Sequence, residues 1–333
     1  MEVATSTEEA NNQTNNWAYV FPGQGSQSVG MGAELFESSQ AARETFEEAD
    51  DSLGFPLSRM IFEGPAQDLQ NTANSQPAIM TTSVAAWRTW QEMQGPQAAT
   101  AKAVAGHSLG EYTSLVAAGV IDFSDAVKLV RKRGELMNQA AVNRPGAMAA
   151  ILGLNELAFA QICDETGVEL ANINTYDQIV ISGDKIAVAR AMDLASARGA
   201  KKTIPLPVSG AFHSSLMFEA QDGLAEAVQA LNFKEPKMPV VGNCDSKPLA
   251  TADGIRSELV NGLCQCVLWK DSVLHLVDFG VTQFVEFGSG GVLAGLIKRI
   301  DRGVKVSTVS DTASMRKLAE VEDYSARFFN GDP

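Results

Sequence analysis

The stretch KAVAGHSLGEYTSLVAA at residues 102–118 decides the fold, because it holds a G-x-S-x-G pentapeptide between two contrasting segments. Residues 102–105 are short and apolar enough for a buried strand, whereas residues 111–118 favour a helix. A serine on a tight strand-to-helix turn is forced outward, and the glycines on both sides let the backbone turn. The first N–H groups of the helix then face any oxyanion formed when Ser108 attacks a carbonyl. The pentapeptide alone is equally compatible with a surface turn, but its flanks favour acyl chemistry through a serine ester.

The composition is typical of a soluble globular protein with a sizeable core. Of 333 residues, 45% are hydrophobic and 20% charged, which is enough for one large domain or for two. No apolar run approaches the roughly 18 residues that span a bilayer. The net charge of −14 argues against nucleic acid as a partner, and an acidic protein partner would need a local basic patch for docking. We therefore expect neither a membrane nor a nucleic acid as partner.

Residues 1–16 contain no Lys or Arg and no apolar core, so we expect a disordered leader and not a targeting signal. The four cysteines, at positions 163, 244, 264 and 266, are too few and too scattered for a disulfide framework. Cys264 and Cys266 have no second pair and no nearby histidine, which argues against a metal site. These features predict a protein of the reducing cytoplasm without a bound metal.

The segments on either side of Ser108 predict a larger α/β domain. A strand at 17–21 stops at PGQGSQ, helical patterns continue to about residue 95, and a long helix runs from Ser124 to about Ala140. The elements expected after residue 210 are helices at 214–231, 254–263 and 271–280, strands at 240–242 and 283–287, and a final helix opened by GSGG at 288–291.

Residues 146–209 are predicted to form a separate unit. Their pattern runs strand, helix, strand, strand, helix, strand, which is the split βαβ arrangement of a ferredoxin-like domain. We expect a large α/β-hydrolase-like domain with this small ferredoxin-like (βαββαβ) domain inserted. The expected boundaries are a leader at 1–16, the large domain at 17–140 and 210–310, the insertion at 141–209, and a tail at 311–333.

A nucleophilic serine needs a base, and the chain offers three histidines. His107 adjoins Ser108, and neighbouring side chains on a turn usually project apart. His275 falls in the interior of a predicted helix, where a structural role is expected. His213 lies in a loop at the exit of the smaller unit, and such junction loops often carry site residues. His213 is therefore the expected base.

Four stretches, taken together and in this order, resemble the malonyl-CoA:acyl-carrier-protein transacylases, the acyltransferase family of fatty acid and polyketide synthesis. They are FPGQGSQ at 21–27, GHSLGEY at 106–112, Arg133-Gly134, and Phe212-His213-Ser214. The resemblance covers about residues 17–310 and also implies the inserted ferredoxin-like domain. It implies malonyl-CoA as substrate, phosphopantetheinylated acyl carrier protein as partner, and no permanently bound cofactor. Nothing in the sequence demands more than a monomer.

The resemblance implies a role for each matching residue. Ser108 is the nucleophile and His213 the base, as a dyad, while the backbone N–H groups of Gln24 and Leu109 form the oxyanion hole. Arg133 grips the free carboxylate of the substrate, for which a planar guanidinium provides a two-pronged donor that lysine lacks. On position alone, a solvated charge on a helix face fits Arg133 better, because its neighbours Arg131 and Lys132 are also basic.

One position departs from the pattern of the family. There, a backbone carbonyl of a Gln-Leu segment holds the other nitrogen of the histidine, and the glutamine is replaced here by Gly262. A carbonyl survives this replacement, whereas any contact from the side chain is lost. Ser289 stands where relatives often have proline, and we expect only a local effect.

Other matching positions concern specificity and docking. Phe212 is bulky where relatives that use methylmalonyl units tend to have serine, so malonyl is preferred, by about 1–3 kcal/mol for one methyl group. Gln76, Asn174 and His107 are expected to line the pocket. The basic residues expected to dock an acidic carrier protein are Lys201 and Lys202, with Lys298 and Arg299 as weaker candidates.

Two other functions remain open on the sequence. A serine hydrolase of the α/β-hydrolase type would use Ser108, Asp245 and His275, in the chain order of that fold; its near neighbour, an editing hydrolase, would have an apolar residue in place of Arg133. A scaffold that binds carrier protein without turnover is the second alternative, for which the Gly262 departure is the supporting feature.

Overall fold

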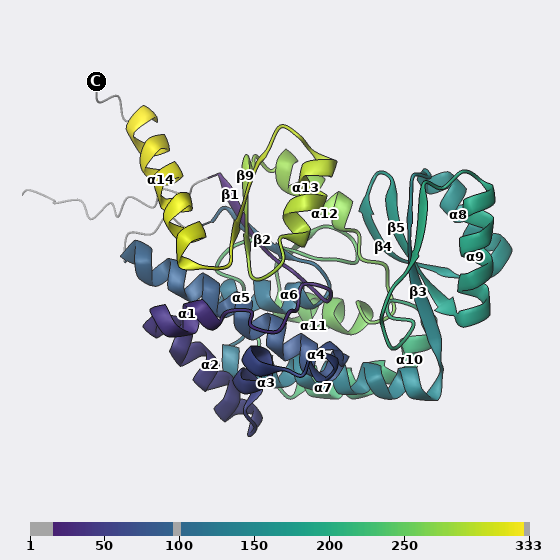
Figure 1. The fold of residues 1–333 in the computed structure, drawn as a ribbon, viewed down its shortest axis with the longest axis horizontal. Helices are drawn as coiled ribbons and strands as arrows, with labels where there is room; N and C mark the ends of the chain where they lie inside the picture. The colour runs from purple at the N-terminus through teal and green to yellow at the C-terminus, as the bar shows by residue number, and fades with distance from the viewer. Residues whose placement is uncertain (1–15, 96–100, 330–333) are drawn as a thin grey trace, which may run out of the picture.

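Two β-sheets organise the chain in the computed structural model, which describes residues 16–95 and 101–329 (Figure 1). The larger sheet has six strands in the order β10-β9-β1-β2-β7-β8, and the smaller has four in the order β4-β5-β3-β6. The protein is therefore a mixed α/β protein, as expected. The leader expected at 1–16 lies outside the described residues, apart from Asn16.

The larger sheet is parallel except at one edge. Its strands are β1 (Trp17–Phe21), β2 (Ala103–Gly106), β7 (Val240–Val241), β8 (Pro248–Leu249), β9 (Gln283–Phe287) and β10 (Lys305–Val309). Only the β7–β8 pair is antiparallel. The loops that follow β1, β2 and β7 therefore lie at one edge of the sheet, and ligands of open parallel sheets bind at this carboxyl edge.

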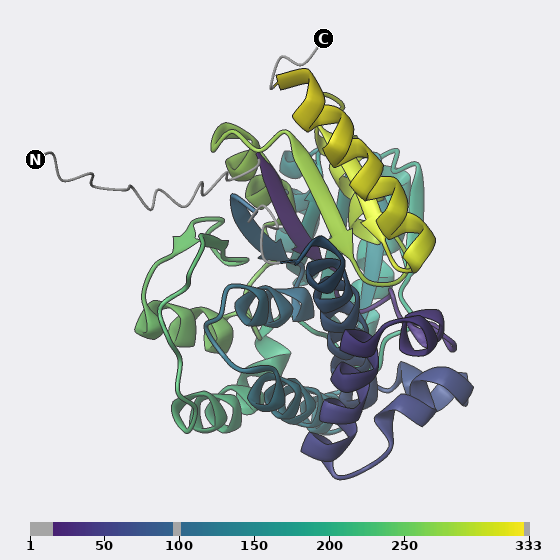
Figure 2. The same cartoon turned by 90° about the vertical axis from the view of Figure 1, so that its left-hand side faces the viewer.

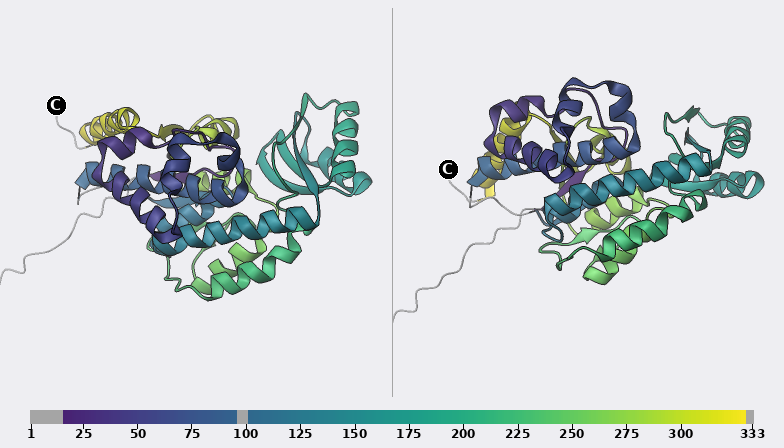
Figure 3. Two further views of the ribbon diagram at one scale, coloured as in Figure 1. Left: turned by 60° about the horizontal axis from the view of Figure 1, so that its bottom comes forward. Right: turned by 90° about the horizontal axis from the view of Figure 1, so that it is seen from below.

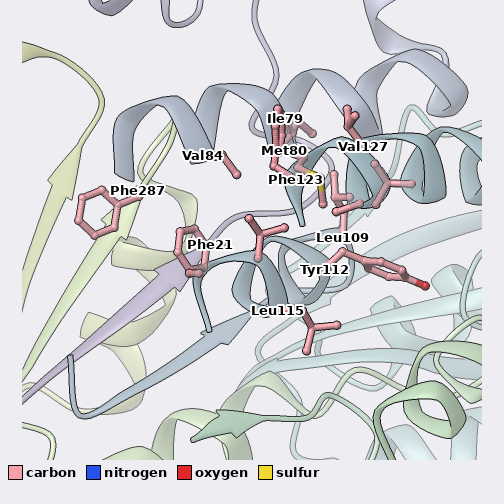
Figure 4. Packing of buried hydrophobic residues seen from close by; sticks show 14 of the residues in the cluster. Phe21, Ile79, Met80, Val84, Leu109, Tyr112, Leu115, Phe123, Val127 and Phe287 are labelled. Carbon is pink, nitrogen blue, oxygen red and sulfur yellow. The ribbon is translucent and has the colours of Figure 1, made fainter. Parts of the chain in front are cut away.

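Strand β1 is buried on both faces, which is typical of a central parallel strand. Tyr19 and Phe21 belong to one apolar cluster, and Ala18 and Val20 to another on the opposite face. Figure 4 shows the first cluster, in which Phe21 packs beneath helix residues such as Val84. The first face is covered by α5 (Thr72–Gln94), α6 (Leu109–Ala117) and α7 (Phe123–Asn143), and the second by α12 (Trp269–Asp278) and α13 (Val292–Ile300).

The other helices surround these two layers (Figure 2). They are α1 (Ala33–Ser38), α2 (Gln40–Leu53), α3 (Leu57–Glu63), α4 (Ala66–Gln70), α10 (Phe218–Gln229), α11 (Ala252–Asn261) and α14 (Thr312–Phe329). Helices α1 to α4 contact α5, and α10 lies between α7 and α11. Within the described ranges, no helix combines the length and apolar character needed to cross a membrane.

The smaller sheet forms a unit at the far end of α7 (Figure 3). Its elements are β3 (Gly146–Leu152), α8 (Glu156–Thr166), β4 (Glu169–Thr175), β5 (Gln178–Asp184), α9 (Lys185–Ala197) and β6 (Lys202–Pro205), and all strand pairs are antiparallel. Helices α8 and α9 cover one face, around Ile151, Phe159 and Ile181. The other face, which carries Met148 and Val180, joins the core of the larger unit. The predicted succession of elements in this segment is confirmed.

The prediction of a final helix after residue 291 was incomplete. Helix α13 is followed by β10 and then by α14, which occupies most of the expected tail. The strand escaped prediction because it lies at the sheet edge and only Val309 is fully buried, so it lacks a long apolar run. Glu34 fixes the start of α14 by accepting a hydrogen bond from the Thr312 N–H (3.1 Å).

The turn between β2 and α6 has a different physical basis from the one expected. The residue with a left-handed backbone is Ser108 itself, with φ 51°. The glycines of the pentapeptide are required by close approach: a Cβ on Gly110 would lie 1.9 Å from the Phe21 carbonyl oxygen, and one on Gly106 would lie 1.9 Å from Gly110. The start of α6 can therefore sit directly on the ends of β1 and β2.

This contact predicts that Gly110→Ala lowers the free energy of unfolding by about 1–3 kcal/mol or more, because the backbone of β1 must shift. Gly295→Ala is the matched control, since Gly295 lies in α13, where an added Cβ would meet no neighbouring atom within 4 Å, and should gain about 0.5–1 kcal/mol in helix propensity. Urea denaturation of both variants measures the two effects. Equal stability of the two variants would contradict the close approach.

Candidate active site

The nucleophile candidate and the base candidate meet at the carboxyl edge of the larger sheet. Ser108 is the N-cap of α6, directly after β2, and His213 lies in the loop between β6 and α10. Ser108 Oγ and His213 Nε2 are 2.8 Å apart. Both residues have left-handed backbones, with φ 51° and 56°. Such conformations are costly for residues other than glycine and persist where the surroundings enforce them, as at active sites.

The other ring nitrogen of His213 fixes which tautomer is present. Nδ1 lies 3.1 Å from the Gln265 carbonyl oxygen, which can only accept, so Nδ1 carries the proton and Nε2 accepts from the Ser108 hydroxyl. The expected holder of this nitrogen, Gly262, is therefore corrected to Gln265. Gly262 has helical backbone angles at the end of α11. The Gly262 carbonyl contributes only the smallest of the effects on the pKa of His213.

The electrostatic surroundings keep His213 neutral. Burial, reinforced by the positive charge of Arg133 and by His107, lowers the pKa of His213 to about 3. The imidazole is 6% exposed, so water offers little stabilisation to a protonated ring. A neutral imidazole is the form that can take a proton from a hydroxyl. His213 is thus in its basic form across the physiological pH range.

This lowered pKa predicts an unusual pH profile. The rate of acylation of Ser108 by a thioester in single turnover should stay level from about pH 8 to about pH 5, because His213 is not yet protonated there. A histidine of ordinary pKa would lose about tenfold per pH unit below about 6.5. The free energy of unfolding has its own pH dependence. Below about pH 6.5, His213 binds a proton in the unfolded chain but not in the folded protein, so the free energy of unfolding falls as the pH falls. An inflection near the ordinary value, in protein still folded by circular dichroism, would contradict this environment.

Arg133 is buried beside the nucleophile. Its Nη2 donates to Ser108 Oγ (3.1 Å) and its Nη1 donates to Gln76 Oε1 (2.8 Å). The residue is 3% exposed, and its guanidinium lies 5.2 Å from the centre of the Tyr112 ring. The alternative of a solvated charge on a helix face is therefore wrong for Arg133, although it holds for its neighbour Lys132, which is exposed.

Two glycines bring these side chains together. A Cβ on Gly134 would lie 2.6 Å from the Cα of Ala73, so Gly134 permits the close crossing of α7 and α5 that places Arg133 against Gln76. A Cβ on Gly23 would lie 2.4 Å from the His107 carbonyl oxygen. The loop after β1 therefore approaches the end of β2 closely enough to place Gln24 at the same pocket as the nucleophile.

The backbone N–H groups expected to form the oxyanion hole are free for this task. Gln24 and Leu109 both line the pocket beside Ser108, and neither N–H donates to an acceptor within the described part of the chain. The N–H of Ser108, by contrast, donates to Asn243 Oδ1 (2.7 Å). A carbonyl oxygen beside the nucleophile can therefore find donors in Gln24 and Leu109.

A pocket of about 170 Å³ opens in front of Ser108, between the two units. Gln76, His107 and Phe212 line it, as expected. Asn174 does not: its Oδ1 accepts from Nε2 of His107 (2.9 Å), and Asn172 lines the pocket in its place. Asn174 thus holds the ring of His107, which also packs on Trp269 at 5.7 Å between ring centres.

The basic residues expected at a docking surface have different surroundings. Lys201 and Lys202 are exposed at the start of β6, and neither lines the pocket. Arg299 donates to Asp177 Oδ1 (2.7 Å) and so ties α13 of the larger unit to the β4–β5 turn of the smaller one. Arg299 is therefore engaged within the molecule. In the described ranges, no three His, Cys, Asp or Glu side chains are placed to hold a metal ion.

The residues of the hydrolase alternative are not brought together. His275 lies inside α12, and Asp245 pairs with Lys247 (3.8 Å). The base at Ser108 is His213, and its second nitrogen faces a backbone carbonyl where a triad would have a carboxylate.

Sequence reasoning missed the polar residues beneath the turn. Asn243 and the buried Glu111 and Glu258 form a hydrogen-bonded group behind Ser108. A signal for Asn243 was available, since it follows a strand and could be expected at the same sheet edge. Gln265 was missed because it acts through its carbonyl, which every residue has.

These features define a class: an α/β protein with a serine–histidine dyad at the carboxyl edge of a parallel sheet and a buried arginine in the same pocket. A family model described as acyl transferase domain matches residues 18–323, and the chain belongs to this family. It is 46% identical to the malonyl CoA-acyl carrier protein transacylase of Bacillus subtilis, over 88% of this chain and 93% of that protein.

Solved structures agree with this assignment. The acyl-carrier-protein-S-malonyltransferase of Bartonella henselae is 41% identical and superposes with a TM-score of 0.89, covering 92% of this chain and 98% of that one. A malonyl-transacylase solved in complex with a type II polyketide synthase acyl-carrier protein is 43% identical, with a TM-score of 0.88, covering 91% of this chain and 99% of that one.

Proposed function

We propose that the protein transfers malonyl from malonyl-CoA to the phosphopantetheine thiol of acyl carrier protein, and so supplies extender units for fatty acid or polyketide synthesis. The observation that carries this proposal is the position of Ser108 Oγ, 2.8 Å from a neutral histidine nitrogen and 3.1 Å from a buried guanidinium. The histidine can activate the hydroxyl, and the guanidinium can bind the charge that distinguishes malonyl from uncharged acyl groups. The names of the relatives agree.

The first half-reaction forms a malonyl-serine ester. Ser108 Oγ attacks the thioester carbonyl while His213 Nε2 takes its proton, and the N–H groups of Gln24 and Leu109 stabilise the oxyanion. When the tetrahedral intermediate collapses, the carbon–sulfur bond breaks and His213 returns the proton to the coenzyme A thiolate. Malonyl remains on Ser108.

The second half-reaction reverses these steps with a different thiol. The phosphopantetheine thiol of acyl carrier protein gives its proton to His213 and attacks the ester, and Ser108 leaves with that proton. Arg133 holds the malonyl carboxylate in both halves, so the same orientation serves both thiols. This ping-pong order requires no resident cofactor: malonyl-CoA is a substrate.

The pocket walls support a preference for malonyl over branched units. Phe212 is 4% exposed and lines the pocket directly before His213. A ring in this position narrows the space for a methyl group on the α-carbon, worth about 1–3 kcal/mol of discrimination. Met148 and Asn172 of the smaller unit complete the wall opposite α6.

The partner we infer is acyl carrier protein, in keeping with the complex formed by one structural relative. The net charge of −14 opposes an acidic partner at long range, so exposed local cations must guide docking. Lys201 and Lys202 are exposed at the start of β6, the strand that leads into the pocket loop, and are the residues we assign to docking.

We also infer the finer architecture from strand order. The order β4-β5-β3-β6, antiparallel throughout and with both helices on one face, is the arrangement of a ferredoxin-like unit inserted at about residues 141–209. The larger unit is α/β-hydrolase-like in placing a serine elbow after a parallel strand.

Intact mass spectrometry tests the proposal. Purified protein mixed with malonyl-CoA should gain the mass of one malonyl group, and addition of acyl carrier protein carrying its phosphopantetheine should discharge it. Carrier protein without the phosphopantetheine is the control and should leave the adduct in place. Steady release of free malonate in place of transfer would indicate a hydrolase, and no adduct at all would support the scaffold.

A further inference from the structure

A buried side chain behind Ser108 takes no part in the mechanism above. Asn243 follows β7, which is the neighbour of β2 in the sheet, so it stands beside the Ser108 turn. Its Oδ1 accepts from the Ser108 N–H (2.7 Å), and its Nδ2 donates to the Gly106 carbonyl oxygen (2.8 Å). One amide group therefore ties the end of the strand to the nucleophile.

Two carboxyl groups hold Asn243 in turn. Its backbone N–H donates to Glu111 Oε1 (3.0 Å) and to Glu258 Oε1 (2.7 Å), and its Nδ2 also reaches Glu111 Oε1 (3.3 Å). The N–H of Cys244 donates to the same oxygen of Glu258 (2.7 Å). Glu111, Glu258 and Asn243 are 3%, 8% and 3% exposed, so water hardly competes for these bonds.

The two carboxyl groups cannot both carry a charge at low cost so close together. Burial, followed by the charge of Glu258, raises the pKa of Glu111 well above its ordinary value, and the two side chains hydrogen bond to each other. A protonated Glu111 donates its O–H to Glu258. The other groups facing Glu111 are Arg133 on α7, Tyr112 on its own helix and Cys244 after β7.

We propose that Asn243 is the positioning residue of the nucleophile, and that Glu111 locks it in place with a proton that it shares in a hydrogen bond with Glu258. The bond from the Ser108 N–H to Asn243 holds the serine in its left-handed conformation. It also leaves the oxyanion to the N–H groups of Gln24 and Leu109. The inference rests on the proposed role of Ser108. Because Asn243 bonds to the backbone of Ser108, we expect the network to act more on kcat than on KM.

A cycle of amide variants tests the shared proton. Glutamine carries permanently the hydrogen that a protonated acid carries, so Glu111→Gln or Glu258→Gln alone keeps the bond between the two side chains. In the double variant the Oε1 atom of each residue is already occupied by two N–H donors, so the two amide nitrogens have no free oxygen of the pair to donate to. We expect each single variant to slow acylation of Ser108 by malonyl-CoA by less than about twofold, and the double variant by roughly 10- to 100-fold, which exceeds the product of the singles.

Two further measurements separate positioning from general stability. Glu286→Gln is the matched control, since Glu286 is a buried carboxyl on β9, two strands from β2, and accepts from the N–H groups of Leu293 and Ala294. It should change Tm and leave acylation intact. The wild type should also lose acylation rate at alkaline pH, when the shared proton leaves Glu111. Glu111→Gln cannot lose that proton and should retain its rate. This comparison decides the question even if the double variant does not fold.

A second probe keeps this inference independent of the substrate. Phenylmethylsulfonyl fluoride reacts with an activated serine: an Oγ–S bond forms, fluoride leaves, and the hydroxyl proton passes to His213. The rate of this mass increase reports the position of Ser108 without malonyl. The inference is overturned if the rate effects of the two glutamine substitutions are additive and the wild type and Glu111→Gln have identical alkaline profiles. If the malonyl adduct still forms in that case, the proposed function stays intact. Non-additive sulfonylation rates without any malonyl adduct would support the inference and overturn the proposed function.

Discussion

Ser108→Ala is expected to abolish the malonyl adduct and to lower transfer to acyl carrier protein by roughly a hundred-thousandfold or more. No other hydroxyl is placed to replace the lost one, because Ser108 alone among the described residues hydrogen bonds to His213 Nε2. The Oγ also accepts from Arg133, so its loss removes a polar contact but opens little space. Tm should therefore change little while activity disappears. Intact mass after incubation with malonyl-CoA gives the result directly.

The control for this variant is a fully buried serine on the same helix. Ser114→Ala, one turn and a half further along α6, removes a buried hydroxyl that bonds only to the Glu111 carbonyl (2.6 Å) and should leave the adduct in place. A malonyl adduct on Ser108→Ala that maps to another residue would mean that the nucleophile has been assigned wrongly.

Arg133→Ala is expected to have the second largest effect, a loss of acylation by malonyl-CoA of roughly 30- to 5,000-fold, which corresponds to about 2–5 kcal/mol. The malonyl carboxylate would enter a pocket from which the matching cation is gone. Acetyl-CoA has no carboxylate, and in the wild type it leaves a buried guanidinium without an anion. The ratio of malonyl to acetyl adduct should therefore fall sharply in the variant, with acetyl accepted at least as well as before.

The ratio is its own control for folding, because an unfolded variant would lose both adducts together. Arg133→Lys tests the geometry: lysine retains the charge but cannot bond to the substrate carboxylate and Gln76 at once as a planar fork does. We expect partial recovery of malonyl transfer, well below the wild type. Unchanged selectivity in Arg133→Ala would show that another group recognises the carboxylate.

The parts of the site that could be predicted are those in which a residue type is indispensable. The turn after β2 requires a nucleophile, Ser108, and the position facing it requires a base, His213. The glycines of the site are required where two backbones nearly touch. Such requirements leave short, unusual motifs in the sequence. The order of the helices and strands could also be predicted, because β1 and β2 are continuous apolar runs, which indicate strands buried on both faces.

The parts that could not be predicted depend on backbone atoms or on register. Gln265 holds His213 through a carbonyl, and no sequence pattern distinguishes one carbonyl from another three residues away. Asn172 and Asn174 are separated by a local irregularity in the β4–β5 register, so their alternation alone could not assign one to the pocket and the other to His107. Edge strand β10 was missed because exposure hides the pattern that marks buried strands.

The site draws on points spread from Gln24 to Gln265, and the smaller unit separates Ser108 from the histidine that activates it. Domains fold as the ribosome delivers them, beginning at the N-terminus. A nascent chain therefore presents Ser108 long before it has a base, and longer still before Asn243 and the Gln265 carbonyl arrive. Its serine remains an ordinary alcohol throughout synthesis. The ability to take up an acyl group thus reports that the chain has been completed and folded at least as far as Gln265.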